Sequence, residues 1–301
     1  MKTKLLVVSL LSAVLGLAQA ADGPVAWWTF DERPARDSSS KENDAQAAVS
    51  GGPTTVLDRA SGARDLIHGH LRRVPGVAGD ALLFDGFTTR VVRPAASVPP
   101  LTRGWTVEAW IAPQEYSWAR TGLVDLDQDG RAGFSFTLNY LGQIGLHAAV
   151  NGQWQGCESK EAVPLLKWSH VAGTFDPETG FALYVNGRLV AQKAAKGRLN
   201  SAEGLDLFIG ASHRKQFPAL TEREPSKKFL SNMVFDGLID EAGIYNRALT
   251  ADEIKTSFAV NAPGNPQPGD SRMGVIPRSA GTFILTWHDS RADSLPAAST
   301  A

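Results

Sequence analysis

Short runs of alternating apolar and polar residues recur along this chain from residue 25 to residue 246. At residues 105–111, for example, the alternation puts the following residues on one face: Trp105, Val107, Ala109 and Ile111. Alternation with a period of two is typical of a half-buried β-strand, because successive side chains of a strand point to opposite faces. Only one segment has helical spacing. The pattern therefore predicts an all-β sandwich rather than alternating strands and helices.

Two local motifs predict a hairpin and the one helix. The pair Asn186-Gly187 separates two apolar runs, and it suits the positive φ angles of a type I′ turn, so we expect a β-hairpin there. The run Thr250-Ala251-Asp252-Glu253 is a capping box, in which the hydroxyl and the carboxylate satisfy each other's backbone N–H groups. The predicted helix begins at Thr250 and ends near Val260, before a segment rich in proline and glycine.

The first twenty residues have the pattern of a secretory signal. Lys2 and Lys4 precede an apolar run at residues 5–17, which is followed by Ala18-Gln19-Ala20. The apolar run is too short to span a membrane as a helix. We therefore expect cleavage after Ala20 and a secreted or periplasmic protein. We divide the rest into one domain at residues 21–260 and a segment at residues 261–301. This segment is a proline- and glycine-rich linker followed either by a simple tail or by the start of a further domain.

The charge balance and the cysteine content exclude one class of partner and one kind of cross-link. The chain has 30 Lys and Arg against 31 Asp and Glu, a formal net charge of −1, and no block of basic residues on a regular element. This balance argues against a nucleic-acid partner. Cys157 is the one cysteine, so no internal disulfide can form. We interpret it as a buried, inert thiol rather than a reactive one.

Six segments, in this order, are similar to one known family. They are WWTFDE at 27–32, GVAGDALLFDG at 76–86, WTVEAWIAP at 105–113, WSHVAGTFD at 168–176, NG at 186–187 and FDGLIDEAGIYNRALTADEI at 235–254. Together they resemble the bacterial laminin G-like jelly-roll family of the concanavalin A-like superfamily. The resemblance implies a two-sheet antiparallel jelly-roll β-sandwich with one short C-terminal helix. Residues 37–75 and 212–233 depart from the family pattern by their length, and long loops are often functional.

The resemblance also implies structural calcium between the first and closing strands. Asp31 follows the first strand, and Asp240 shares a face with Ala242 and Ile244, so its carboxylate should point to the core, where an unpaired charge is costly. Ca²⁺ prefers oxygen ligands, and Asn43 or Asp44 would complete the shell. The alternative is that both aspartates accept backbone hydrogen bonds.

We interpret the EF-hand-like run at 125–130 as an acidic turn, because position twelve lacks the required glutamate.

Sugar sites commonly set an aromatic ring against a pyranose, with polar groups nearby. The candidates in polar stretches are Tyr116, Trp118 and Trp154, although large aromatic residues often cap the core instead. His213 and Arg214 open a basic loop that suits an acidic sugar, unless this is simply a solvated loop. We assign His170 a structural role, and packing roles to the aromatic residues within strand patterns: Trp27, Trp105, Trp110 and Trp168.

Catalysis is not expected from this sequence. Sugar-hydrolysing members of the superfamily carry Glu-x-Asp-x-x-Glu or Glu-x-Asp-x-Glu, and neither run occurs here. Asp240 and Glu241 are adjacent, so they should point to opposite faces of a strand. We therefore predict a non-catalytic carbohydrate-binding module, accessory to a polysaccharide-acting protein. The second hypothesis is an adhesion module that binds a protein or the cell envelope, and the third is an enzyme with an acid pair from distant residues.

Overall fold

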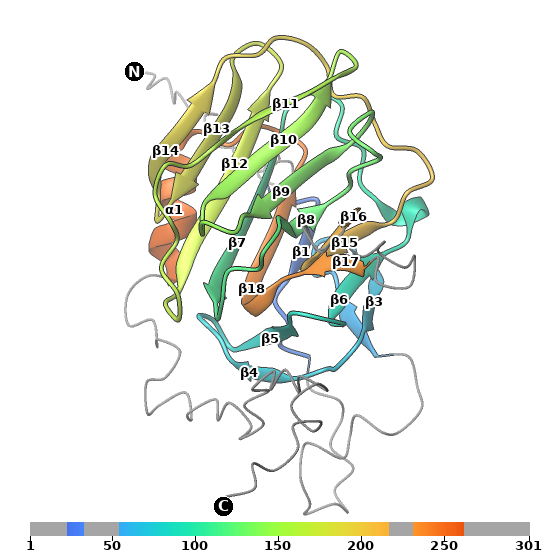
Figure 1. Cartoon of the computed structure of the whole chain (residues 1–301), viewed down its shortest axis with the longest axis vertical. Coiled ribbons are helices and arrows are strands. Elements are labelled where there is room, and N and C mark those ends of the chain that lie inside the picture. Colours follow the sequence, from blue (N-terminus) through green and yellow to red (C-terminus); the bar gives the residue numbers. More distant parts are fainter. Residues whose placement is uncertain (1–22, 33–53, 217–230, 262–301) are drawn as a thin grey trace, which may run out of the picture.

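Two antiparallel sheets of eight strands each face one another as a sandwich in the computed structural model, which describes residues 23–32, 54–216 and 231–261 (Figure 1). Sheet I has the order β14-β13-β12-β7-β18-β5-β4, with β1 also paired to β18, and sheet II has the order β11-β10-β9-β8-β15-β6-β3-β2. A two-stranded ribbon, β16-β17, accompanies them. The predicted all-β sandwich is confirmed. No helix in the described residues is long and apolar enough to cross a membrane.

The strand bounds are as follows. Sheet I contains β1 (Ala26–Trp28), β4 (Arg73–Pro75), β5 (Asp80–Asp85), β7 (Trp105–Pro113), β12 (Ser169–Asp176), β13 (Gly180–Val185), β14 (Arg188–Lys193) and β18 (Asp236–Tyr245). Sheet II contains β2 (Thr55–Leu57), β3 (Arg64–His68), β6 (Arg90–Arg93), β8 (Thr121–Asp125), β9 (Phe134–Leu138), β10 (Ile144–Val150), β11 (Gln153–Glu158) and β15 (Leu207–Ile209). The remaining elements are the ribbon strands β16 (Ala211–Gln216) and β17 (Ser231–Val234), the 3-10 turn η2 (Ala95–Ser97) and the helix α1 (Ala251–Asn261).

The main core lies between the two sheets. Trp105 of β7 packs with its ring centre 4.5 Å from that of Phe134 on β9 and 6.1 Å from that of Phe175 on β12. All three side chains are fully buried. Burying a large apolar side chain contributes about 1.5–3 kcal/mol, so this aromatic cluster helps to hold the sheets together.

Helix α1 covers part of the opposite, outer side of sheet I. There, Phe258 packs on Trp110 with ring centres 5.6 Å apart. The capping box forms as predicted, since Thr250 N donates to Glu253 Oε2 at 2.8 Å and Glu253 N donates to Thr250 Oγ1 at 3.3 Å. A second apolar cluster occupies this side, and Phe258 of the helix packs against it. We call it the outer cluster, and its buried residues are Val74, Ala81, Trp110, Ala112, Trp168 and Leu238.

The two predicted turns are also confirmed. Asn186 and Gly187, with φ angles of 51° and 71°, join β13 to β14. The acidic run after β8 forms a turn in which Asp129 and Gly130 have φ angles of 54° and 69°, and Gly130 N donates to Asp127 Oδ1 at 2.6 Å. Asparagine, aspartate and glycine tolerate such angles with little strain.

Two sequence-based expectations about the fold were wrong. The stretch 212–233 was expected to be a long loop, but it begins within β16 and ends within β17. Residues 37–75 were expected to be a long connection, but β2, β3 and β4 lie in its second half. In β3 the buried positions are Asp65 and Ile67, so a charged residue occupies a place where an apolar one is normal. Because of Asp65, the sequence of β3 does not show the alternation of apolar and polar residues that is typical of a strand. The predicted signal segment, Asn43, Asp44 and the tail after Asn261 lie outside the described residues.

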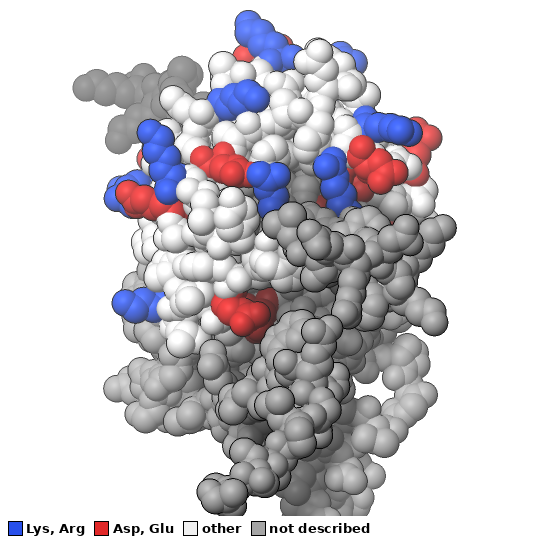
Figure 2. Space-filling model, in the orientation of Figure 1, with Lys and Arg blue, Asp and Glu red and all other residues white. Residues whose placement is uncertain are grey.

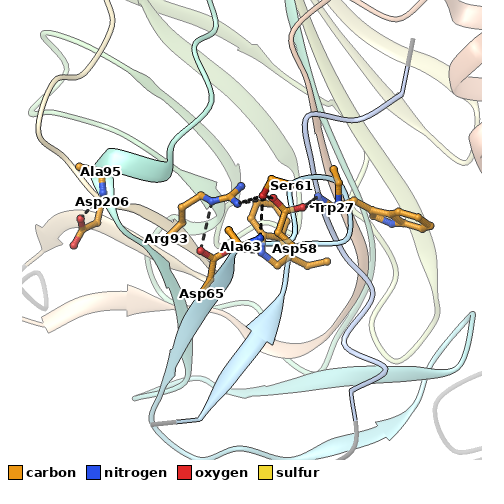
Figure 3. A network of polar contacts seen from close by, with 10 residues as sticks. Trp27, Asp58, Ser61, Ala63, Asp65, Arg93, Ala95 and Asp206 are labelled. Carbon is orange, nitrogen blue, oxygen red and sulfur yellow. Dashed lines mark hydrogen bonds and ion pairs between the residues drawn. The ribbon is translucent and has the colours of Figure 1, made fainter. Parts of the chain in front are cut away.

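A buried ion cluster explains why Asp65 points inward (Figure 3). The Arg93 Nη2 lies 2.5 Å from Asp58 Oδ2, and its Nε lies 3.5 Å from Asp65 Oδ1. Trp28 Nε1 donates to Asp65 Oδ2 at 2.6 Å, and Trp27 N donates to Asp58 Oδ1 at 2.8 Å. Burial raises the pKa of Asp65, although Trp28 and Arg93 oppose the rise. The cluster therefore joins β1 of sheet I to β3 and β6 of sheet II.

Candidate functional site

Trp154 and Arg214 meet on the outer side of sheet II. Trp154 lies on β11 and pairs with Ala149 of β10, whereas the neighbours Ala148 and Val150 belong to the main core. Strand alternation therefore turns Trp154 away from the core. The guanidinium carbon of Arg214, on β16, lies 5.0 Å from the centre of the Trp154 ring. Such a cation–π contact contributes about 0.5–1 kcal/mol at an exposed site.

The turn between β8 and β9 fixes the Arg214 side chain. Asp127 in this turn forms an ion pair with Arg214 Nε, and the Asp127 side chain is almost fully buried whereas that of Arg214 is partly exposed. The predicted ligand residues Trp154 and Arg214 are thus brought together by a third residue that was interpreted only as part of an acidic turn. We call Trp154, Arg214 and Asp127 the Trp154 cluster.

A row of polar side chains continues from Trp154 across β10. The His147 ring lies nearly parallel to that of Trp154, with centres 6.4 Å apart and planes 12° apart. Burial, followed by the Arg120 charge, lowers the pKa of His147 to about 4, so its ring is neutral near pH 7. At the far end, Arg120 and Glu158 form an ion pair. On the face shown in Figure 2, basic and acidic side chains lie next to one another.

His213 does not join the Trp154 cluster. Its ring stacks on Phe208 of β15, with centres 3.8 Å apart, and its Nε2 lies 2.7 Å from the backbone oxygen of Asp206. The His213 backbone N–H donates to Asp125 Oδ2 at 2.7 Å. Burial raises the pKa of Asp125 to about 7. His213 thus contributes mainly to the attachment of β16 to sheet II.

Tyr116 and Trp118 lie in the loop between β7 and β8 and differ in role. The Tyr116 hydroxyl donates to the backbone oxygen of Val163 at 2.5 Å, and its ring packs so closely under Gly142 that a side chain at Gly142 would collide with it. Tyr116 therefore supports the neighbouring loops. Trp118 is about half exposed and remains available for contacts with a ligand.

Asp31 and Asp240, the two described residues of the predicted metal site, both accept backbone hydrogen bonds from the segment that joins β4 to β5. Asp31 Oδ1 accepts a hydrogen bond from Asp80 N at 2.9 Å. Asp240 Oδ2 accepts hydrogen bonds from Val77 N at 2.8 Å and Ala78 N at 3.2 Å. Val77 and Ala78 belong to the turn between β4 and β5, and Asp80 is the first residue of β5. These backbone contacts are those of the hydrogen-bonding alternative.

The third predicted ligand, Asn43, lies outside the described residues. Within the described part of the chain, no group of three or more His, Cys, Asp or Glu side chains is arranged to hold a metal ion. Burial raises the pKa of Asp240 to about 8. Calcium at this junction stays a prediction.

The predicted orientation of Asp240 was wrong. Before a β-bulge in β18, Asp240 pairs with Trp110 of the outer cluster; after it, Ile244 pairs with Val107 of the main core. Glu241 lies within this bulge and has a φ angle of 49°. One additional residue inverts the alternation of a strand. Asp240 therefore lies on the outer side, although it is fully buried under the β4–β5 turn.

Trp27 was wrongly assigned to packing alone. It is 37% exposed, whereas Trp105, Trp110 and Trp168 are buried as predicted. The Trp27 Nε1 donates to Glu241 Oε2 at 2.8 Å. Trp27 and Glu241 border a pocket of about 200 Å³ beside α1, whose other lining residues are Pro24, Glu108, Trp110, His170, Tyr245, Ser257, Val260 and Asn261. The sequence did not reveal this pocket, because polar residues on one face of β7 look like ordinary solvent-facing positions.

Cys157 is half-buried on β11. Burial raises the pKa of its thiol to about 11, so the thiol stays protonated near neutral pH. The thiolate is the reactive form of cysteine. The arrangement agrees with an inert thiol, although the side chain is less buried than expected.

Comparison with known sequences gives one family and one curated relative. Residues 85–255 match the family described as the concanavalin A-like lectin/glucanases superfamily. The pentraxin-related protein PTX3 of Mus musculus is 30% identical over 125 residues, which cover 41% of this chain and 31% of that protein. The match therefore spans less than a third of the length of this relative.

Several solved structures have a similar fold. Domain 4 of AbnA, an extracellular arabinanase of Geobacillus stearothermophilus solved with arabinotriose, is 17% identical with a TM-score of 0.52, and the match covers 78% of this chain and 98% of that one. Botulinum neurotoxin type C, whose cell entry depends on two ganglioside molecules, is 12% identical with a TM-score of 0.55, covering 82% and 53%. Trypanosoma rangeli sialidase is 17% identical with a TM-score of 0.51, covering 78% and 32%.

These structural similarities, at low sequence identity, concern the fold. The family match covers more than half of the chain, and the described strands form a two-sheet antiparallel sandwich. The chain therefore belongs to the concanavalin A-like lectin/glucanases superfamily.

Proposed function

We propose that the protein is an exported, non-catalytic module that binds a glycan at the Trp154 cluster. The observation that carries this proposal is the contact between Trp154 and Arg214, with Arg214 fixed by Asp127. An aromatic surface beside a charged donor in a fixed position suits a sugar, because the ring contacts C–H groups and the guanidinium bonds hydroxyl or carboxylate oxygens. The half-exposed Trp118 provides a second aromatic surface.

The similar proteins support a glycan as the ligand class. The arabinanase domain was solved with arabinotriose, and the neurotoxin depends on gangliosides. The match to one domain of a larger arabinanase also supports an accessory role beside a polysaccharide-acting protein. Export rests on the signal pattern of residues 1–20, and it is tested by N-terminal sequencing of protein from the periplasm or medium, which should begin at Ala21.

The test of glycan binding combines an array screen with calorimetry on the best ligand. We expect W154A and R214A each to weaken binding by about tenfold, which corresponds to about 1.4 kcal/mol. The matched control is F87A, because Phe87 is an aromatic residue with 81% exposure that lies outside the Trp154 cluster. F87A should bind like the wild type. No glycan affinity in any screen, or equal losses in F87A and W154A, would contradict the proposal.

A second function, adhesion to a protein or the cell envelope, is favoured by a different observation. Four large apolar side chains that are 40–60% exposed lie in the β9–β10 turn and the β11–β12 loop: Tyr140, Leu141, Leu165 and Leu166. These two segments are joined by a hydrogen bond from Val163 N to Gly142 O at 2.7 Å. Exposed apolar patches often mark interaction surfaces. Loss of cell-envelope binding in L141D and L165D, with glycan binding intact, would support this function.

A further inference from the structure

The pocket beside α1 lies on the outer side of sheet I and is separate from the Trp154 cluster on sheet II. It is formed where β1, β7, β12 and β18 meet the end of the helix. Its volume of about 200 Å³ is enough for several water molecules or one small organic group. The pocket therefore suits a small ligand or one terminal group of a larger ligand.

The first acidic group of the pocket is Glu108 of β7, whose side chain is 9% exposed. Its Oε1 accepts hydrogen bonds from the Tyr245 hydroxyl at 2.9 Å and the Ser257 hydroxyl at 3.1 Å. Its Oε2 has no hydrogen-bond donor among the described residues. His170 Nε2 lies 3.3 Å from this oxygen, at the distance of an ion pair but without the geometry of a hydrogen bond. A buried carboxylate with one unsatisfied oxygen is costly unless a further partner compensates it.

The second acidic group is Glu241, placed on this side by the bulge in β18. The Trp27 Nε1 donates to its Oε2 at 2.8 Å. Burial raises the pKa of Glu241 to about 7, against the Trp27 hydrogen bond, and the negative charges of Asp31 and Glu108 contribute to the rise. The ten described residues that line the pocket include no lysine or arginine. Arg59, which forms an ion pair with Glu32 outside the pocket, also lowers the pKa of Glu241 slightly.

Three aromatic side chains complete the wall: Trp27, Trp110 and Tyr245. Aromatic faces attract cations, most strongly when the cation loses part of its hydration. Carboxylates attract the same ligands and additionally accept N–H hydrogen bonds. Metal ions fit less well, because no cluster of three metal-binding side chains is arranged around one point among the described residues. The walls thus favour an organic cation with N–H donors.

We infer that this pocket binds the primary ammonium group of a small organic amine, held between the Glu108 and Glu241 carboxylates and the Trp27 ring. A quaternary ammonium ion fits less well, since it lacks the N–H groups that the carboxylates accept. A neutral molecule of the same shape lacks the charge. The inference is independent of glycan binding, because it concerns the other sheet.

The experiment uses the Trp27 indole N–H signal in ¹H–¹⁵N spectra, assigned by its loss in W27F. Three probes are titrated at equal concentrations: n-butylammonium, n-butanol and tetramethylammonium. We expect n-butylammonium to shift the signal saturably, tetramethylammonium to bind more weakly, and n-butanol to have no saturable effect. Equal effects of n-butanol and n-butylammonium, or no saturable shift with n-butylammonium, would overturn the inference.

Matched variants locate the site. E241Q and E108Q should each weaken n-butylammonium binding by about tenfold, through loss of a charge-assisted hydrogen bond. The control is E161Q, because the Glu161 side chain is 81% exposed and lies outside the pocket. The W154A variant should bind n-butylammonium like the wild type. A loss in E161Q as large as that in E241Q would reject the assignment. If E108Q fails to fold, the half-buried Glu241 still provides the decisive comparison.

Discussion

The guanidinium carbon of Arg93 lies 5.0 Å from the centre of the Trp28 ring, and both side chains are almost completely buried. Trp28 belongs to β1 of sheet I, whereas Arg93 belongs to β6 of sheet II. The Asp58 and Asp65 carboxylates compensate the charge of Arg93 between them. A polar cluster thus replaces apolar packing at one edge of the sandwich.

The R93M variant should be strongly destabilised, because it leaves two buried carboxylates without their cation. Removal of one partner of a buried ion pair costs about 3–5 kcal/mol. Denaturant unfolding measures this difference directly. R64M serves as the control, since Arg64 is exposed and donates a hydrogen bond to the Thr55 hydroxyl. It should change stability by less than about 0.5 kcal/mol. Similar values for both variants would show that the cluster contributes little.

The stability of the fold should depend on pH through Asp125. Burial raises the pKa of Asp125 from 3.8 to about 7, so the folded chain holds a proton that the unfolded chain loses between these values. The contribution of Asp125 is therefore complete below about pH 4 and declines as the pH rises towards 7. His147 acts in the opposite direction, because its pKa is lowered to about 4.

The comparison of wild type with D125N isolates the Asp125 effect. Asparagine does not titrate, so the wild type should lose stability relative to D125N as the pH rises from about 4 to 7, by about 1.4 kcal/mol per pH unit at most. Unfolding curves at several pH values provide the measurement. A constant difference between the two proteins over this range would mean that Asp125 is ionised in the folded state.

Calcium at the junction of Asp31 and Asp240 is tested by thermal unfolding with Ca²⁺ and with a chelator. A ligand that binds only the folded state raises the melting temperature by mass action. We expect a higher melting temperature with Ca²⁺ in the wild type and a smaller shift in D31N. D31N is preferred to a change of Asp240, which anchors the β4–β5 turn by two backbone hydrogen bonds. Identical melting temperatures with and without Ca²⁺ would remove calcium from the description.

Gly210 and Gly152 separate the effects of backbone strain and of space. Their φ angles are 77° and 78°, but a side chain at Gly210 would collide with Phe84, whereas nothing lies within 4 Å of one at Gly152. G152A should cost about 1–2 kcal/mol for the left-handed backbone alone. G210A should cost a further 1–3 kcal/mol or so from overpacking. Equal losses of unfolding free energy would mean that Phe84 moves aside freely.

Features determined by neighbouring residues could be predicted from the sequence. The Asn186-Gly187 hairpin and the Thr250 capping box each depend on a few consecutive residues, and both form as expected. The strand β3 was missed, because Asp65 occupies an inward position that two distant residues, Trp28 and Arg93, make favourable. No local pattern contains this information.

The candidate site was predictable only in its parts. Trp154 and Arg214 could be selected individually, but their contact depends on the path of β16, which follows β15 of sheet II after Gly210, and on Asp127 pairing with Arg214. The pocket beside α1 was not predictable, since Glu108 and Glu241 come from strands far apart in sequence and a bulge decides the direction of Glu241.

At the bulge in β18, the positions that face the main core change from odd-numbered to even-numbered residues. Before it, the odd-numbered Ile239 faces the main core; after it, the even-numbered Ala242 and Ile244 do so. Deleting a single residue here would restore a uniform alternation and reverse either the core-facing or the outer-facing half of the strand. Length at this position should therefore be more constrained than residue identity. When homologous chains are aligned across this strand, a gap of one position would signal a different outer surface, even where every neighbouring letter matches.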